Sequence, residues 1–122
     1  MLINFSFSNW MSFKKEASFS MTASRKLQHQ QHLTKLPKYN TQILPISAIY
    51  GGNASGKSNF FKALEFCQNF ILFGPPLDTP NIYLNAFYLD KESYKNPSSF
   101  SFDLLIDDSI YNFAFTLTKQ KF

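Results

Sequence analysis

The sequence contains a single cysteine, Cys67, among its 122 residues. One thiol cannot form an internal disulfide, and Cys67 lies in a helical pattern, so a reducing compartment is the simplest interpretation. Long hydrophobic runs are also missing. Runs such as Phe70–Phe73 are far shorter than the roughly 20 apolar residues that a membrane span needs. The first ten residues carry no basic segment of the kind that begins a secretory signal. These absences predict a soluble cytoplasmic protein that does not enter a membrane.

Acidic residues are scarce in the first half of the chain. Residues 1–62 hold eight of the 12 basic residues against Glu16 alone, so this half carries +7, whereas residues 63–122 carry −3. A basic half suits a site for phosphate. Nucleic-acid binding is an alternative, but an imbalance of this size is more often an ordinary solvated surface.

The chain does have enough apolar material for a modest core. Hydrophobic residues make up 44% of it, and 15 residues are Phe. This composition excludes disorder of the whole chain, and the length allows one domain.

Hydrophobic periodicity predicts strands at the N-terminus. Leu2–Phe7 alternates apolar and polar residues, and Ala17–Thr22 alternates more weakly, which together indicate a hairpin or the start of a meander. Ser24–Asn40 is rich in polar residues and predicts a linker or loop, with a short helical turn near Lys26–Leu33 as an option.

A strand, a glycine-rich loop and a helix are predicted next. Ile43–Tyr50 is a compact apolar run that fits a buried strand. Lys57–Phe73 has a narrow polar stripe on a broad apolar surface, which predicts a helix that is mostly buried. Gly74, followed by two prolines, ends it.

The remainder has the pattern of β-structure. Phe87–Leu89 is one candidate strand. Phe100–Ile106 and Tyr111–Leu117 both alternate, and Asp107–Ser109 lies between them, which predicts a hairpin with a polar turn.

One motif carries chemistry. The segment between the predicted strand and helix matches G-x-x-x-x-G-K-[ST], the phosphate-binding P-loop, and consists of Gly51, Gly52, Asn53, Ala54, Ser55, Gly56, Lys57 and Ser58. The glycines let successive N–H groups point inward at phosphate oxygens, and the helix N-terminus favours an anion. Lys57 would supply charge to the β- and γ-phosphates, and Ser58 would offer its hydroxyl to Mg²⁺. A glycine-rich turn with an incidental lysine is the alternative, and the strand–loop–helix context favours the P-loop.

Leu104–Asp108 imitates the apolar strand ending in acids that holds Mg²⁺ in P-loop proteins. Asp103 interrupts the apolar run, and the alternation continues beyond the acids. A hairpin turn therefore explains this segment better.

Other candidate groups have simpler explanations. His29 and His32 are too few for structural zinc, which takes four ligands. Cys67 is most simply a small core residue. Phe13–Lys15 lies near the end of the first strand and could approach adenine or phosphate, although a solvated turn is the simpler assignment. An aromatic group on the predicted helix is assigned to core packing: Phe60, Phe61, Phe66 and Phe70.

The order "INFSFSNWMSF", "ASFSMTA" and "LPISAIYGGNASGKSNFFKALEF" resembles the N-terminal lobe of ABC-class P-loop ATPases. Within that class it is most similar to the SMC-like and OLD-like group, the AAA-family ATPases of bacterial and phage defence. The similarity is specific over Ile3–Phe66 and looser over Phe87–Leu117.

The resemblance implies an α/β fold in which the strand–P-loop–helix unit packs with antiparallel strands and hairpins. It also implies ATP and Mg²⁺ as cofactors, with Gly51 to Gly56 around the phosphates. Two such heads would sandwich two nucleotides as a homodimer. In the defence members the movement of the heads controls an attached or partner nuclease.

The chain departs from that group because its sequence shows no convincing Gln-loop, signature segment, Asp-Glu strand or switch histidine. The expectation is one partial ATPase domain, divided into residues 1–23, 24–42, 43–73 and 80–122, that needs the remainder of a head or a partner subunit. Alone it is expected to bind ATP weakly and to hydrolyse it slowly or not at all.

Two other classes of function stay open, a regulatory subunit without turnover and a nucleic-acid-binding module. ATP is favoured over GTP because no N-K-x-D motif is present.

Overall fold

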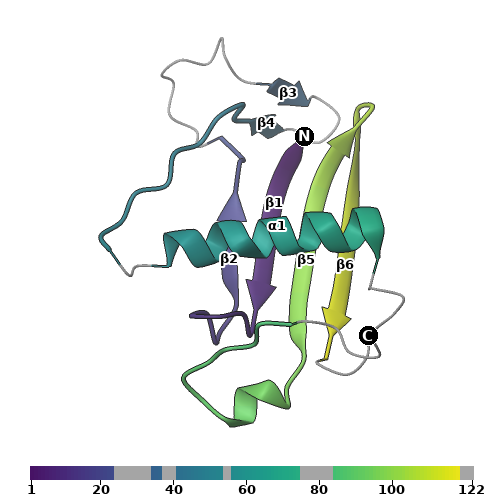
Figure 1. The fold of residues 1–122 in the computed structure, drawn as a ribbon. Coiled ribbons are helices and arrows are strands. Elements are labelled where there is room, and N and C mark those ends of the chain that lie inside the picture. The colour runs from purple at the N-terminus through teal and green to yellow at the C-terminus, as the bar shows by residue number, and fades with distance from the viewer. Residues whose placement is uncertain (24–33, 37–40, 54–55, 75–83, 119–122) are drawn as a thin grey trace.

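The computed structural model describes residues 1–23, 34–36, 41–53, 56–74 and 84–118. Its elements in chain order are β1 (Leu2–Ser8), β2 (Ala17–Ser20), β3 (Thr34–Leu36), β4 (Thr41–Ile43), α1 (Lys57–Phe73), the 3-10 helix η3 (Glu92–Tyr94), β5 (Ser98–Ile106) and β6 (Ser109–Leu117). Four strands form an antiparallel sheet in the order β2-β1-β5-β6. Helix α1 crosses one face of this sheet, and the short β3–β4 pair lies at the end of the sheet near the N-terminus (Figure 1).

The alternation in β1 and β5 produces an aromatic face on the sheet. Phe5 and Phe7 of β1 are buried opposite Phe102 and Phe100 of β5, and the Phe5 and Phe102 rings stack with centroids 4.7 Å apart. Serines occupy the alternate positions, as in the Ser6–Ser101 pair. Because side chains alternate between faces with a period of two, the sheet has one apolar face toward α1 and one polar face. The predicted N-terminal strand and its pairing with β2 are confirmed.

Helix α1 has the bounds that the sequence predicts. Gly74 ends it with a positive φ of 69°, which glycine adopts without strain, and donates its N–H to the Phe70 carbonyl at 2.9 Å. Ala63 and Cys67 are its buried residues, and both lie in the main core. Small side chains at these two positions let the helix approach the aromatic face closely.

The prediction of a mostly buried helix is wrong. Phe61, Leu72 and Phe73 are 54%, 65% and 78% exposed. Phe60 instead packs on Phe5 with ring centroids 5.9 Å apart. A helix that rests on a single sheet buries one stripe, and periodicity alone cannot tell whether a second layer covers its other side. Phe61 is therefore outside the core to which the sequence assigned it.

The β5–β6 hairpin is confirmed, as is the assignment of its acids to a turn. Ile106 pairs with Ser109, and only Asp107 and Asp108 connect them. Their φ values are 49° and 65°, so both residues are left-handed, as a two-residue type I′ turn requires. The turn geometry gives these acids a structural role.

Two predicted strands are not formed. Within Ile43–Tyr50 only Ile43 belongs to a strand, the end of β4, and Ile46 and Tyr50 are 81% and 89% exposed. Pro45 has no N–H to donate, and no described strand pairs with residues 44–50, so a buried strand has no ladder there. Residues 88 and 89 form a turn in place of the strand expected at Phe87–Leu89.

The region expected to be a polar linker, residues 24–42, contains β3 and the first two residues of β4, and the sequence predicted neither strand. They are three residues each, too short for periodicity to reveal. The optional helical turn at Lys26–Leu33 and the histidines at 29 and 32 lie outside the described residues. Within the described part of the chain, no helix is long and apolar enough to cross a bilayer.

Asn9 joins the end of β1 to the segment that precedes β5. Its side chain is buried, and its amide donates to the carbonyls of Ser93 at 2.9 Å and Asn96 at 3.0 Å. Its Oδ1 accepts from the Phe87 N–H at 3.0 Å. The residue also has φ of 54°, which asparagine tolerates better than most residues. A single side chain thus joins the end of β1 to η3 and to the residues on either side of it.

The variant Asn9→Ala should lose about 2 kcal/mol of unfolding free energy, because it leaves buried carbonyls and an N–H without partners. Urea denaturation measures this loss. The control Asn69→Ala, on the exposed side of α1, should change stability by less than about 0.5 kcal/mol. Equal effects of the two substitutions would contradict the bridging role.

Candidate functional site

The glycine-rich loop leads directly into the first turn of α1. Gly51, Gly52 and Asn53 are exposed and irregular, and Gly56 is the N-cap with φ of 97°. Among the described residues, no side chain caps this helix end and no acid lies in its first turn. The positive end of the helix dipole is therefore not offset by a neighbouring anion. This arrangement favours an anionic ligand at the start of the helix.

Lys57, the first residue of α1, turns its side chain back over the loop. Its Nζ donates to the carbonyl oxygens of Gly51 and Gly52, the latter at 2.8 Å. These contacts keep a positive charge at the mouth of the loop. An ammonium held there can exchange carbonyl oxygens for phosphate oxygens over a short distance, since both are acceptors.

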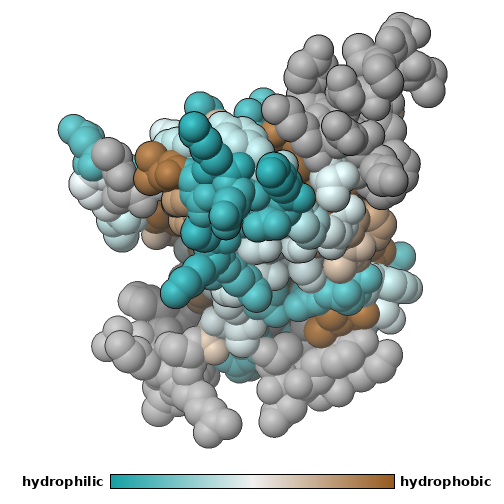
Figure 2. All heavy atoms as spheres, turned by 90° about the horizontal axis from the view of Figure 1, so that it is seen from below, coloured by the Kyte–Doolittle hydropathy of each residue, from teal (hydrophilic) through white to brown (hydrophobic). Residues whose placement is uncertain are grey.

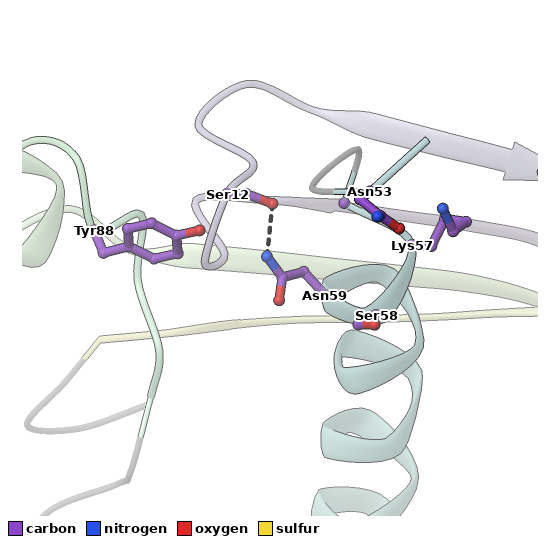
Figure 3. Close-up of a pocket in the computed structure, with 7 residues that line it drawn as sticks. Ser12, Asn53, Lys57, Ser58, Asn59 and Tyr88 are labelled. Atoms are coloured by element: carbon purple, nitrogen blue, oxygen red, sulfur yellow. Dashed lines mark hydrogen bonds between the residues drawn. The ribbon is translucent and has the colours of Figure 1, made fainter. Parts of the chain in front are cut away.

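A cavity of about 280 Å³ adjoins the start of α1 (Figure 3). Three separate segments line it: Ser12 from the loop after β1, Asn53 and Gly56–Asn59 from the glycine-rich loop and helix, and Tyr88 from the segment after α1. Of the predicted site residues, the structure brings Asn53, Gly56, Lys57 and Ser58 together here. Gly51 and Gly52 contribute their carbonyls to Lys57, and residues 54 and 55 lie outside the described residues.

The loop after β1 forms hydrogen bonds that hold the start of α1 in place. The Trp10 indole N–H donates to the Asn59 carbonyl at 3.0 Å, and the Asn59 amide donates to Ser12 Oγ at 2.8 Å. A Cβ added to Gly56 would lie 3.0 Å from Cζ of Phe13. The glycine is thus required twice, by its positive φ and by the close approach of an aromatic ring.

Sequence reasoning missed Ser12, Asn59 and Tyr88 as lining residues. Asn59 directly follows the motif, which is the one signal that could have found it. Ser12 and Tyr88 carry no signal, because only the fold brings residues so distant in sequence to one cavity. The sequence offers Phe13–Lys15 as a segment that could approach adenine or phosphate, and the structure places the Phe13 ring next to Gly56.

Lys14, in contrast, has an ion pair with a residue of another loop. Its Nζ lies 2.7 Å from Oδ2 of Asp90. The Lys14 ammonium keeps the pKa of the Asp90 carboxyl below its ordinary value, first by hydrogen bonding. Both groups lie at the surface. Seen from below the view of Figure 1, the described surface is mostly hydrophilic, with separate apolar patches (Figure 2). The pair ties the loop after β1 to the segment that carries Tyr88.

The remaining candidates stay outside the site. Cys67 is fully buried in the core, and burial raises the pKa of its thiol, so the assignment to core packing is confirmed. Asp107 and Asp108 belong to the hairpin turn. Within the part of the chain that the structure describes, no three His, Cys, Asp or Glu side chains gather into a metal site.

The donor set at the helix start fits nucleotide phosphates with Mg²⁺. It combines an uncapped helix N-terminus, the ammonium of Lys57 and the exposed hydroxyl of Ser58. Backbone N–H groups and an ammonium neutralise phosphate oxygens, and a single hydroxyl suits Mg²⁺, which keeps several waters and takes its other ligands from phosphate.

The glycine-rich loop leads into α1, but the strand predicted before the loop is not formed, so the complete strand–P-loop–helix unit stays a prediction. The family model described as "AAA domain, putative AbiEii toxin, Type IV TA system" matches residues 46–122. The chain belongs to this family of AAA-type P-loop ATPase domains, which implies a P-loop NTPase fold and nucleotide binding, typically with Mg²⁺. The mixed α/β structure with its four-stranded sheet is consistent with that fold. No curated protein and no solved structure matches the chain.

The variant Gly56→Ala should destabilise the fold by about 1–3 kcal/mol, because the new Cβ meets the Phe13 ring at a φ that alanine rarely adopts. Urea denaturation tests this expectation. Gly52→Ala is the matched control, since a Cβ there has nothing within 4 Å, and it should leave stability nearly unchanged. If both variants were equally stable, the contact between Phe13 and the loop would not constrain the site.

Proposed function

We propose that the chain binds ATP with Mg²⁺ at the glycine-rich loop. The observation that carries the proposal is Lys57, held over the loop at the uncapped start of α1 and lining a cavity with Ser58. Backbone N–H groups of Gly51–Gly56 would surround the phosphates. Lys57 would neutralise the β- and γ-phosphates, and the Ser58 hydroxyl would be a ligand of Mg²⁺.

In this proposal the protein's contribution is mainly electrostatic. Lys57 and the helix dipole place positive charge where phosphate oxygens would lie, before any ligand arrives. Bound Mg²⁺ supplies further neutralisation of the β- and γ-phosphates. The contacts of Trp10 and Ser12 with Asn59 keep the first turn of the helix in place, so little ordering is needed on binding.

The variant Lys57→Ala should reduce the affinity for Mg-ATP by at least about 10-fold, because it removes a charge-assisted hydrogen bond to phosphate. Calorimetric titration of Mg-ATP into the folded chain is the measurement. Lys62→Ala, which removes an exposed lysine of the same helix, should bind as the unmodified chain does.

Unmodified chain that is folded but does not bind Mg-ATP would refute the proposal. So would binding that Lys57→Ala leaves intact, because the nucleotide would then occupy another site.

The proposal extends to an SMC-like or OLD-like ATPase head that acts in pairs and controls a nuclease or toxin in bacterial defence. The N-terminal sequence resemblance and the family's description as a toxin of a type IV toxin–antitoxin system support this extension. Gly51–Asn53 and Ser58 are also exposed, so one chain leaves the phosphate site open on one side. The apolar outer side of α1, with Phe61 and Leu72, is where the remainder of a head or a partner subunit would pack.

If two heads act as a pair, saturating Mg-ATP should convert the chain from monomer to dimer, because each copy would close the open side of the other's site. Light scattering with and without Mg-ATP measures the change in mass, and Lys57→Ala should stay monomeric. A chain that binds ATP and stays monomeric at saturation would contradict pairing by this chain. Phosphate release measured in the same samples would separate an ATPase from a regulatory subunit that binds without turnover.

A further inference from the structure

The cavity at the start of α1 extends beyond the residues of the P-loop motif. Lys57 lies on one side of the helix start, whereas Ser12, Asn59 and Tyr88 lie on the other (Figure 3). In the proposed function, Lys57 and Ser58 take the β- and γ-phosphates and the metal, so they fix the position of the terminal phosphates. The rest of the ligand must then extend toward the side of the cavity that is lined by residues outside the motif.

Tyr88 is held beside this cavity by the loop after β1. Its N–H donates to the Met11 carbonyl at 3.2 Å, and the Met11 N–H donates to the Asn85 carbonyl at 2.8 Å. Two residues further on, Asp90 forms its ion pair with Lys14. The backbone around Tyr88 is thus attached at several points to the same loop that contacts the start of α1, and the Tyr88 ring stacks on Phe87 with centroids 6.3 Å apart.

Tyr88 is 52% exposed although hydrogen bonds hold its backbone. An exposed tyrosine is ordinary at a protein surface, but this one lines the cavity that Lys57 and Ser58 also line. Aromatic side chains stack on nucleobases, and such contacts tolerate any base because each base has a π-face. The hydroxyl of Ser12 and the amide of Asn59 add polar groups beside it, as a ribose or base edge would require.

We propose that Ser12, Asn59 and Tyr88 form the nucleoside end of the nucleotide site, with the Tyr88 ring against the face of the base. This inference rests on the proposed function, since it assigns the second half of the same site. It gives the segment after α1 a role in ligand binding that the P-loop motif does not contain.

The test compares a ligand that has a nucleoside with one that has none. Calorimetry would measure the binding of Mg-ATP and of magnesium tripolyphosphate to the unmodified chain and to Tyr88→Ala. The substitution should weaken Mg-ATP about 10-fold, which corresponds to about 1.4 kcal/mol, and should change tripolyphosphate less than about twofold. Tyr111→Ala, which removes a tyrosine of similar exposure on β6, should leave both affinities unchanged.

Two further variants separate the aromatic face from the bulk of the side chain. Tyr88→Phe keeps the ring and should bind Mg-ATP within about twofold of the unmodified chain, whereas Tyr88→Leu should lose about as much as Tyr88→Ala. Thermal melting would confirm that each variant is folded. Equal loss of Mg-ATP and tripolyphosphate binding, or Mg-ATP binding that Tyr88→Ala does not change, would overturn the nucleoside assignment.

These outcomes differ from a failure of the proposed function. If neither ligand binds the unmodified chain, or if Lys57→Ala does not change binding, the proposed phosphate site is refuted, and the proposed nucleoside end is refuted with it. If Mg-ATP binding depends on Lys57 but not on Tyr88, only the nucleoside assignment is lost.

Discussion

The indole of Trp10 connects the core of the sheet to the first turn of α1, and the geometry of the candidate site depends on this connection. The side chain is buried, and its ring packs on Phe66 of α1 and Phe100 of β5 with centroids 5.0 and 5.8 Å apart. Its N–H donates to the carbonyl of Asn59 in the first turn of the helix. A buried indole N–H needs an acceptor, so packing of the ring also determines where the helix begins.

The position of α1 follows from the sizes of the side chains that meet between helix and sheet. The sheet contributes large rings, among them Phe5 and Phe7. The helix contributes Ala63 and Cys67, which are its buried residues. Interiors are packed to nearly crystalline density, so large groups on one side require small ones on the other. The same packing explains why the thiol of Cys67 has a structural rather than a chemical role.

The sequence predicted the features that depend on local pattern. The alternation in β1, the hairpin turn at Asp107 and Asp108, and the end of α1 at Gly74 were all predicted, because each rests on periodicity or on a preferred local conformation. The assignment of Gly51–Ser58 as a P-loop rests on residue spacing and stays a prediction. The predicted strand at Ile43–Tyr50 failed because a strand needs hydrogen-bonding neighbours, which an apolar run does not reveal. Ser12 and Tyr88 could not be found, because they reach the cavity only through tertiary contacts.

Several residues that hold the candidate site in place lie outside the part of the chain that the family model matches. The match begins at residue 46, whereas Trp10, Ser12 and Phe13 precede it by more than 30 residues. Yet Phe13 is the group that a side chain at position 56 would strike, and Ser12 accepts the hydrogen bond from Asn59. The glycine of the motif and the ring that makes it necessary thus lie in different segments. The start of α1 is therefore held in place by contacts from β1 and the loop after it, and a substitution in that loop would reach Gly56 and Asn59 although it lies outside the matched segment.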